Sequence, residues 1–247
     1  MRDKLYNSLN FELLHRGAKP YLLKFESATT TPNLDEYIKK GDPKTGTPFA
    51  ERDLVPARVE FVSRSESTII CAPMTWAQHV WSNLDEVRTK LPEHERLRAI
   101  SVAVLVETGD GLFPLALRSK QVTLYPGYWH VSAAGYVDLK KAESSRSFLP
   151  SVFAELHEEL NLLPADIVSI SQLGLCRHLT PNVASVEVCF YAKTALTFEQ
   201  VRESSESARD KYEGKYSFVT REQIQAMLAG APFNPAGAAT ALMAFEL

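Results

Sequence analysis

Three glutamates in the middle of the chain have the spacing of a side-chain cluster. Glu155, Glu158 and Glu159 lie at positions i, i+3 and i+4, which places them on one face of an α-helix. Like charges at this spacing repel each other and destabilise an isolated helix. A cluster that works against its own helix suggests that a cation binds between the carboxylates. Sites rich in carboxylate oxygens suit Mg²⁺ or Mn²⁺.

A solvated surface helix is the alternative interpretation of the same residues. Phe153, Leu156 and Leu160 fall on a different face from the acids, so the helix can pack on a sheet through its apolar side. Glutamate favours helices, and most runs of charged residues are simply exposed to water. The residues of the helix alone are compatible with both interpretations, a cation site and a solvated surface.

The elements that precede the helix form a regular pattern. The β-branched residues 100–106 predict a buried strand, and a Gly-rich turn leads into a returning strand at 112–118, so that the two form a hairpin. Residues 129–134 predict a strand that runs into Gly135. A polar loop follows, and the acidic helix then begins with a proline in its first turn, where the missing N–H costs little.

The rest of the chain divides into a less regular first part and a regular second part. Residues 28–57 are rich in Thr, Pro, Gly, Asp and Lys and predict a long surface connection with a short helix near 34–39. Strands are predicted within 58–71, and a helix over 75–90. The further predictions are a loop at 136–149, helices at 150–160, at 221–228 and after Asn234, and strands at 167–179, 185–192 and 216–219.

The glycine, the loop and the acidic helix together resemble the Nudix box, the sequence signature of the Nudix hydrolase family. This box is written G-x5-E-x7-R-E-U-x-E-E-x-G-U, where U is aliphatic. Gly135 matches the leading glycine, the E-U-x-E-E core begins at Glu155, and Leu162 matches the final aliphatic residue. The resemblance covers residues 96–247 and implies an α/β (α+β) fold, an α/β/α sandwich with a mixed sheet. Residues 1–95 are then an N-terminal extension that packs on this Nudix domain.

The chain departs from the box in three ways. Ala154 stands where the box has an arginine, which in the family helps to hold the catalytic helix and its glutamates. Asn161 replaces the closing glycine, a mild change because Asn is the next best residue for a left-handed helix C-cap. Gly135 lies 20 positions before Glu155 where the pattern has 15, so the loop is longer, and Glu143 is a candidate for the first box glutamate.

The resemblance implies Mg²⁺-dependent (or Mn²⁺-dependent) hydrolysis of a nucleoside diphosphate linked to another moiety, with a nucleotide sugar preferred. A diphosphate resists attack because its oxygens repel a nucleophile, and divalent cations neutralise that charge and acidify a bound water. By family analogy Glu155 and Glu159 are the principal metal ligands, and Glu158 is a ligand or the base. Glu158 and Glu159 are thus also the catalytic candidates. Candidates for a base outside the box are Glu187, Glu203, Glu206 and Glu213.

Candidate substrate contacts come from a strand end and from the box. Arg118 offers a planar fork that suits phosphate, and a surface salt bridge is the alternative. Gly135 is the second candidate, as the leading glycine of the box. The aromatic rings of Tyr125, Tyr128 and Trp129 can stack on a base or ribose, but we favour a role in the core or in turns.

Two other functions are alternatives to this hydrolase activity. Ala154 and the lengthened loop favour a catalytically weak or inactive Nudix-fold module that binds a nucleotide or a partner. An isoprenyl-diphosphate isomerase shares the fold but uses a cysteine and a set of metal-binding histidines. The positions of Cys71, Cys176 and Cys189 do not suggest that arrangement.

Net charge, the lengths of apolar runs and cysteine usage limit which partners and which cellular compartment we expect for the protein. The 247 residues carry a formal net charge of −3 and have a pI of about 6.1, so we expect no nucleic-acid partner. No apolar run approaches the roughly 20 residues that span a bilayer, and the first residues lack the apolar core of a signal peptide. Three cysteines without CxxC pairing favour a reducing cytoplasm over a disulfide or zinc site. Aromatic residues near the N-terminus can serve a homodimer as well as a core.

Overall fold

The structure is a computed structural model that describes residues 98–245 except 123, 180–184 and 212–213. Before residue 98 it describes residues 9, 11–17, 22–25, 55–56, 68–71, 73–74, 78–79, 84 and 89. The helix predicted near 34–39 lies outside the described residues, as does nearly all of the connection predicted at 28–57 and of the helix predicted at 75–90.

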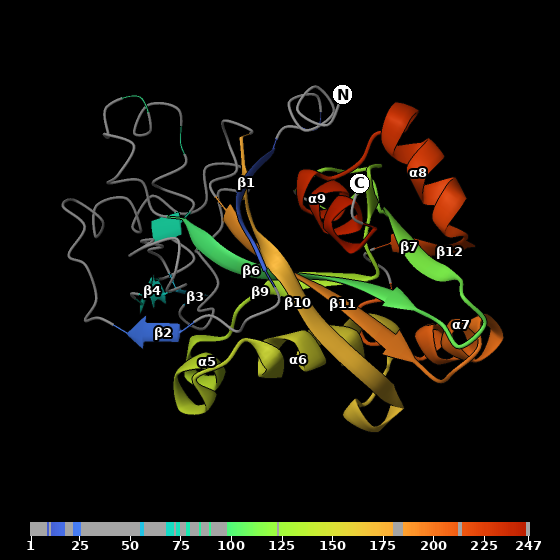
Figure 1. The fold of residues 1–247 in the computed structure, drawn as a ribbon, viewed down its shortest axis with the longest axis horizontal. Helices are drawn as coiled ribbons and strands as arrows, with labels where there is room; N and C mark the ends of the chain where they lie inside the picture. Colours follow the sequence, from blue (N-terminus) through green and yellow to red (C-terminus); the bar gives the residue numbers. More distant parts are fainter. Residues whose placement is uncertain are drawn as a thin grey trace.

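A five-stranded sheet forms the centre of the molecule, in the order β1-β10-β11-β6-β9 (Figure 1). Its strands are β1 (Phe11–Arg16), β6 (Ala99–Glu107), β9 (Ala133–Tyr136), β10 (Ile167–His178) and β11 (Ser185–Thr194). β6 and β11 run parallel, and the other neighbours are antiparallel, so the sheet is mixed. All residues of β6 except the last are buried, as predicted from its β-branched composition.

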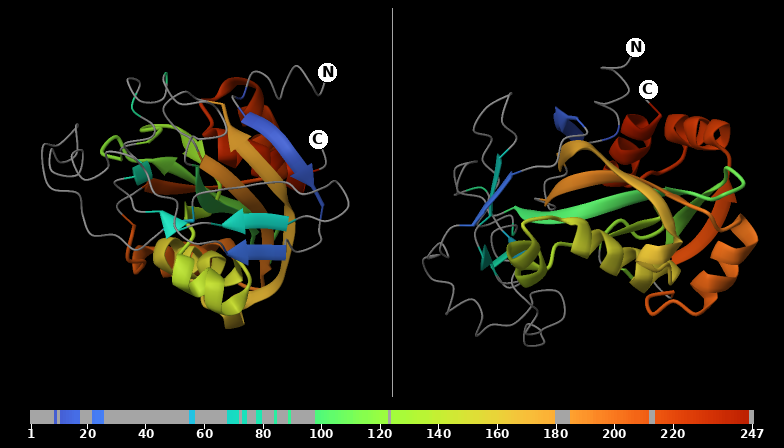
Figure 2. Two further views of the ribbon diagram at one scale, coloured as in Figure 1. Left: turned by 90° about the vertical axis from the view of Figure 1, so that its left-hand side faces the viewer. Right: turned by 60° about the horizontal axis from the view of Figure 1, so that its bottom comes forward.

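Helices cover both faces of this sheet (Figure 2). One face carries α5 (Leu139–Ser145) and α6 (Leu149–Leu160), and the other carries α8 (Arg221–Gly230) and α9 (Pro235–Ala244). Alternate residues of a strand point to opposite faces. Val104 of β6 therefore packs in one core with Leu156 of α6, while Leu105 packs in the other core with Leu242 of α9. The predicted α/β/α arrangement around a mixed sheet is confirmed.

A second sheet of three strands shows that the predicted hairpin was wrong. This sheet contains β7 (Phe113–Arg118) between β12 (Gly214–Val219) and β8 (Trp129–His130). β6 does not pair with β7, because β11 and β9 already occupy both of its edges. The strand predicted at 129–134 is in fact two strands, because β8 belongs to the second sheet and β9 to the first.

The loop predicted at 136–149 contains a helix, α5, which corrects the sequence prediction. Asp138 caps its N-terminus by accepting a hydrogen bond of 2.9 Å from the Lys141 N–H. Ala142 is buried in the core beneath α6. The extra residues between Gly135 and the acidic helix thus form a short helix beside it.

The remaining predictions of the second part are confirmed. The strands predicted at 167–179, 185–192 and 216–219 are β10, β11 and β12, and the predicted helices at 150–160, at 221–228 and after Asn234 are α6, α8 and α9. A further helix, α7 (Phe198–Glu206), was not predicted. Thr197 and Gln200 form a capping box at its start, and this pair of residues is the sequence signal that indicates the helix.

The N-terminal segment contributes an edge strand to the central sheet. β1 pairs with β10, from Phe11 opposite His178 to Arg16 opposite Gly174. Two small strand pairs accompany it: β2 (Leu22–Phe25) with β4 (Thr68–Cys71), and β3 (Val55–Pro56) with β5 (Pro73–Met74). The division of the chain at residue 95 stays a prediction. Among the residues that the structure describes, no helix has the length and apolar character needed to cross a bilayer.

Candidate active site

The acidic face of α6, which consists of Glu155, Glu158 and Glu159, is presented to solvent because the opposite side of the helix is buried. Leu156 and Leu160 are fully buried, whereas the three glutamates are partly exposed. The helix ends at Asn161, which has the left-handed backbone angles φ 55° and ψ 33°. Asparagine thus takes the conformation of the glycine that closes the box, as the sequence predicted.

Glu155 lies directly against Gly135 of β9. A Cβ atom at Gly135 would overlap all the atoms of the Glu155 carboxylate. Glycine is therefore required here for close approach, since any side chain would displace the acid. Two residues that are 20 positions apart in the sequence thus form one contact.

Glu159 is held by two hydrogen bonds from outside its helix. The Ala134 N–H of β9 donates to Oε1 at 2.8 Å, and the Tyr216 hydroxyl of β12 lies 3.3 Å from Oε2. The same hydroxyl lies 3.0 Å from the Ser132 carbonyl oxygen, so its one proton is shared between two acceptors. Glu159 is consequently fixed between the two sheets.

Glu158 contacts the connection between α7 and β12. Its Oε1 atom lies 3.3 Å from Nη1 of Arg209. Its backbone oxygen accepts a hydrogen bond of 2.9 Å from the Asp210 N–H. This glutamate therefore faces a different neighbour from Glu155 and Glu159, which lie against β9.

The acidic face carries the type of donor atom that a divalent cation prefers. Carboxylate oxygens are the ligands that Mg²⁺ and Mn²⁺ prefer, and Gly135 leaves room for one of these carboxylates, that of Glu155. Within the described part of the chain, no three His, Cys, Asp or Glu side chains gather closely enough to hold a metal. The structure thus places the three glutamates on one helix face, each bound to protein groups.

Arg118 ends β7, where it organises the connection between β7 and β8. Its Nε donates to the Leu124 carbonyl oxygen at 3.1 Å, and its backbone oxygen accepts from the Gly127 N–H at 3.0 Å. Its backbone N–H donates to the Tyr128 oxygen at 2.9 Å. These contacts of Arg118 lie within the connection between β7 and β8 rather than at the acidic face.

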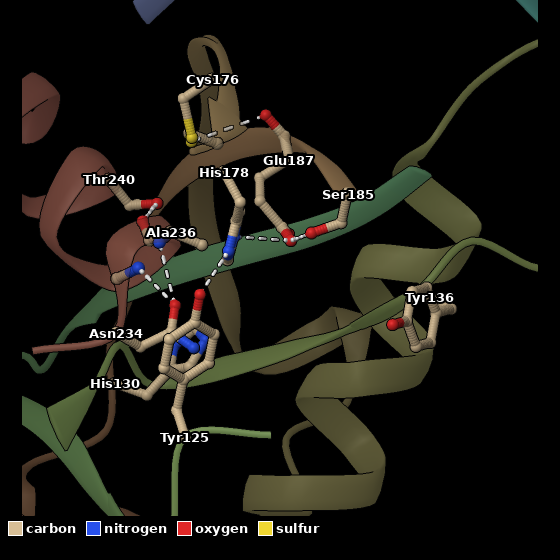
Figure 3. Close-up of polar contacts among 12 residues, drawn as sticks. Tyr125, His130, Tyr136, Cys176, His178, Ser185, Glu187, Asn234, Ala236 and Thr240 are labelled. Atoms are coloured by element: carbon tan, nitrogen blue, oxygen red, sulfur yellow. Dashed lines mark hydrogen bonds and ion pairs between the residues drawn. The ribbon is translucent and has the colours of Figure 1, made fainter. Parts of the chain in front are cut away.

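A buried chain of polar side chains lies behind the same connection (Figure 3). The Tyr125 hydroxyl is 3.1 Å from Nδ1 of His178, and Nε2 of His178 is 3.2 Å from Oε1 of Glu187. The Ser185 hydroxyl donates to the same carboxylate oxygen at 3.1 Å. Tyr125, His178 and Glu187 thus form a continuous line of polar contacts that runs from the connection after β7 to β11.

Glu187 is charged despite its burial. Burial raises its pKa, but hydrogen bonding to His178 and the charge of that imidazole outweigh this effect, so that the pKa is lowered.

His130 of β8 lies near the same groups. Burial, followed by the positive charge of Arg118, lowers the pKa of His130 to about 3, so this imidazole is neutral at pH 7.

The base candidates outside the box lie in different environments. Glu187 is buried and engaged with His178, whereas Glu203 and Glu206 are exposed on α7. Glu213 lies outside the described residues. Glu143, the candidate for the first box glutamate, is exposed on α5.

Two side chains that contact the acidic face, Tyr216 and Arg209, were not predicted from the sequence. Tyr216 is 57 positions from Glu159, and nothing local in the sequence links the two residues. Among the aromatic candidates, Tyr128 is 38% exposed, while Tyr125 is engaged with His178.

Comparison with known proteins finds similarity in structure only. No protein-family model and no curated protein matches the chain. The DR0079 protein of Deinococcus radiodurans matches with a TM-score of 0.47 and 16% identity, over 78% of this chain and 98% of that one. The MutT protein of Methanosarcina mazei Go1 matches with a TM-score of 0.40 and 20% identity, over 60% of this chain and 93% of that one. Four further matches carry the name of the Nudix family.

The chain resembles Nudix hydrolases. A bifunctional NMN adenylyltransferase/ADP ribose pyrophosphatase of Francisella tularensis also matches, with a TM-score of 0.44 and 10% identity, over 68% of this chain and 46% of that one.

Proposed function

We propose that this protein is a hydrolase of the Nudix kind, which uses a divalent cation to cleave the phosphoanhydride bond of a nucleoside diphosphate linked to another moiety. The contact between Glu155 and Gly135 is the observation that carries this proposal. It sets one acid of α6 against β9, and the neighbouring Ala134 N–H binds a second acid, Glu159. Two carboxylates therefore converge on the same short strand.

The acidic face supplies the groups that such a reaction needs. Glu155, Glu158 and Glu159 would hold Mg²⁺ or Mn²⁺, which when bound neutralises phosphate charge and acidifies water. In the hydrolysis, the water oxygen bonds to phosphorus, the anhydride P–O bond breaks, and the departing phosphate takes the electron pair. Glu158, whose side chain is 31% exposed, is our candidate to accept the proton of the water.

A nucleotide sugar is the substrate class that we propose. Arg118 and Gly135 are the proposed substrate-binding residues. The Nε bond to Leu124 fixes the Arg118 guanidinium, and its terminal nitrogens can then donate to phosphate in parallel. At Gly135 the absence of a side chain leaves room for the Glu155 carboxylate to lie against the backbone.

A nucleotide-binding module with weak or no activity is the second candidate. The observation that favours it is that Glu158 and Glu159 are both engaged with protein groups, Arg209 in one case and Ala134 in the other. Such contacts compete with a cation. Ala154 at the box arginine position favours the same alternative.

The two candidates predict different results in a turnover screen. Phosphate release is measured with Mg²⁺ or Mn²⁺ over nucleotide sugars, dinucleotides and nucleoside triphosphates. We expect turnover of at least one class, and a loss of about 100-fold or more in kcat for Glu159→Gln, because a metal ligand is removed. Glu199→Gln, an exposed acid in the first turn of α7, is the matched control and should keep parental activity.

Two results would count against this assignment. Saturable nucleotide binding by the parent protein without turnover of any class supports the binding module. Parental turnover by Glu159→Gln would remove the acidic face from the mechanism, even if the parent is an active hydrolase.

A further inference from the structure

Arg209 forms an ion pair with one glutamate of the acidic face, Glu158. Nη1 of its guanidinium lies 3.3 Å from Oε1 of Glu158, and its Nε lies 3.8 Å from Oδ1 of Asp210. The Arg209 side chain is 74% exposed, and that of Glu158 is 31% exposed. The protein itself therefore provides a cation for a carboxylate that a metal ion would also use.

The backbone beside Arg209 is fastened to the end of α6. The Asp210 N–H donates to the Glu158 oxygen at 2.9 Å, and the Ser204 hydroxyl donates to the Asn161 oxygen at 3.0 Å. These bonds satisfy carbonyl groups that the last turn of a helix leaves without internal donors. The position of Arg209 thus depends on backbone bonds as well as on its ion pair. The guanidinium stays within reach of the acidic face when the ion pair opens.

The ion pair itself is easy to open. Exposed pairs of this kind contribute little stability, because water screens them and holding two long side chains costs entropy. A guanidinium and a divalent cation repel each other at short distance and cannot both lie against the same carboxylate oxygen. A cation that binds Oε1 of Glu158 would therefore displace Arg209. The released guanidinium can bind a phosphate group through two parallel N–H donors.

We propose that Arg209 exchanges partners: it neutralises Glu158 in the metal-free protein, and it binds a diphosphate oxygen of the substrate once a divalent cation occupies the acidic face. This inference rests on the proposed function, since it requires a cation at Glu158. It assigns a phosphate-binding role to the connection between α7 and β12, which the box does not include.

The first test is metal binding by calorimetry without substrate. Mg²⁺ is titrated into the parent, Arg209→Gln and Arg202→Gln proteins. Arg202 is exposed on α7 and loses the same charge, so it controls for the general effect of charge on cation binding. We expect Arg209→Gln to bind Mg²⁺ about two- to fivefold more tightly than Arg202→Gln, because the competing ion pair is gone. Raising the salt concentration should reduce this difference.

The second test separates charge from shape. Arg209→Lys keeps a competing charge but loses the planar fork, so its Mg²⁺ affinity should stay parental. Its KM for the turned-over diphosphate should rise about tenfold, since a charge-assisted hydrogen bond to phosphate is weakened. Equal Mg²⁺ affinities for the Arg209→Gln and Arg202→Gln proteins overturn the exchange while leaving the proposed function intact. Failure of the parent to bind Mg²⁺ or Mn²⁺ overturns both.

Discussion

At the scale of single residues, Gly135 is the position whose type the site requires most strictly. The atoms that a Cβ would meet belong to the end of the flexible Glu155 side chain and not to backbone. An added methyl group can therefore be accommodated by moving the carboxylate. The cost then falls on the geometry of the acidic face rather than on the fold.

Gly135→Ala should accordingly weaken metal binding while leaving stability nearly unchanged. We expect a free energy of unfolding within about 1 kcal/mol of the parent, because alanine also lowers the entropy of the unfolded chain. The affinity for Mn²⁺ should fall about tenfold or more, as it does when the surroundings of a ligand are disturbed. Gly230→Ala is the control, because a Cβ there would meet nothing within 4 Å. A large loss of stability with parental Mn²⁺ affinity would contradict this account of Gly135.

The acids themselves could be predicted from sequence, but their partners could not. The spacing of Glu155, Glu158 and Glu159 is a local property of the helix, and the structure places all three on its exposed side. Tyr216 and Arg209 reach the same face from distant parts of the chain. Such contacts depend on the pairing of β12 and on the docking of the segment after α7.

At the scale of elements, the connection between β7 and β8 (residues 119–128) is tied to β10 by a partly buried hydrogen bond between Tyr125 and His178. Tyr125 has a positive φ of 51°, which is uncommon for a residue with a side chain and persists when surrounding contacts hold it. The bond to Nδ1 of His178 is one such contact, and Arg118 supplies another through Leu124. The connection that carries the proposed phosphate-binding arginine thus depends on the buried polar chain.

Tyr125→Phe should loosen this connection. The imidazole of His178 loses a buried hydrogen bond, which costs about 1–3 kcal/mol. We expect faster amide hydrogen exchange for residues 119–128 and a raised KM, with parental Mn²⁺ affinity. Tyr128→Phe is the control because its side chain is 38% exposed. Parental exchange rates in Tyr125→Phe would mean that the hydroxyl does not hold the connection.

The types of most elements could be predicted from local pattern, but their pairing could not. The Gly-rich turn after residues 100–106 indicated a hairpin, yet β7 joins β12 instead. A turn is read from a few adjacent residues, whereas a strand partner is decided by which edges remain available. β11 and β9 occupy both edges of β6, and neither is adjacent to it in sequence.

At the scale of the whole molecule, two buried neutral imidazoles make stability depend on pH. Burial lowers the pKa of His79 to about 4, and burial with the charge of Arg118 lowers that of His130 to about 3. In the unfolded chain both titrate near 6.5. Between these values the unfolded chain binds protons that the folded protein does not. The stability that these residues contribute is therefore full above about pH 6.5 and is lost as the pH falls towards 3 to 4.

His130→Asn should flatten this dependence. An asparagine oxygen can accept the Val131 N–H that Nδ1 of His130 accepts at 2.8 Å, so the local bond is kept while the titrating group is removed. We expect the free energy of unfolding in urea to fall less steeply below about pH 6.5, by up to about 1.4 kcal/mol per pH unit. An unchanged slope would show that His130 is protonated in the folded protein over this range.

The proposed function depends on the whole fold, because β9 of the central sheet and β12 of the second sheet both contact the acidic face of α6. A crystal structure of the protein soaked with Mn²⁺, with the anomalous signal recorded, tests it most directly. The account predicts a Mn²⁺ peak bound by oxygens of Glu155, Glu158 and Glu159, with Arg209 turned away from Glu158. A Mn²⁺-saturated crystal with no peak at these carboxylates, or with a peak only elsewhere, would contradict it.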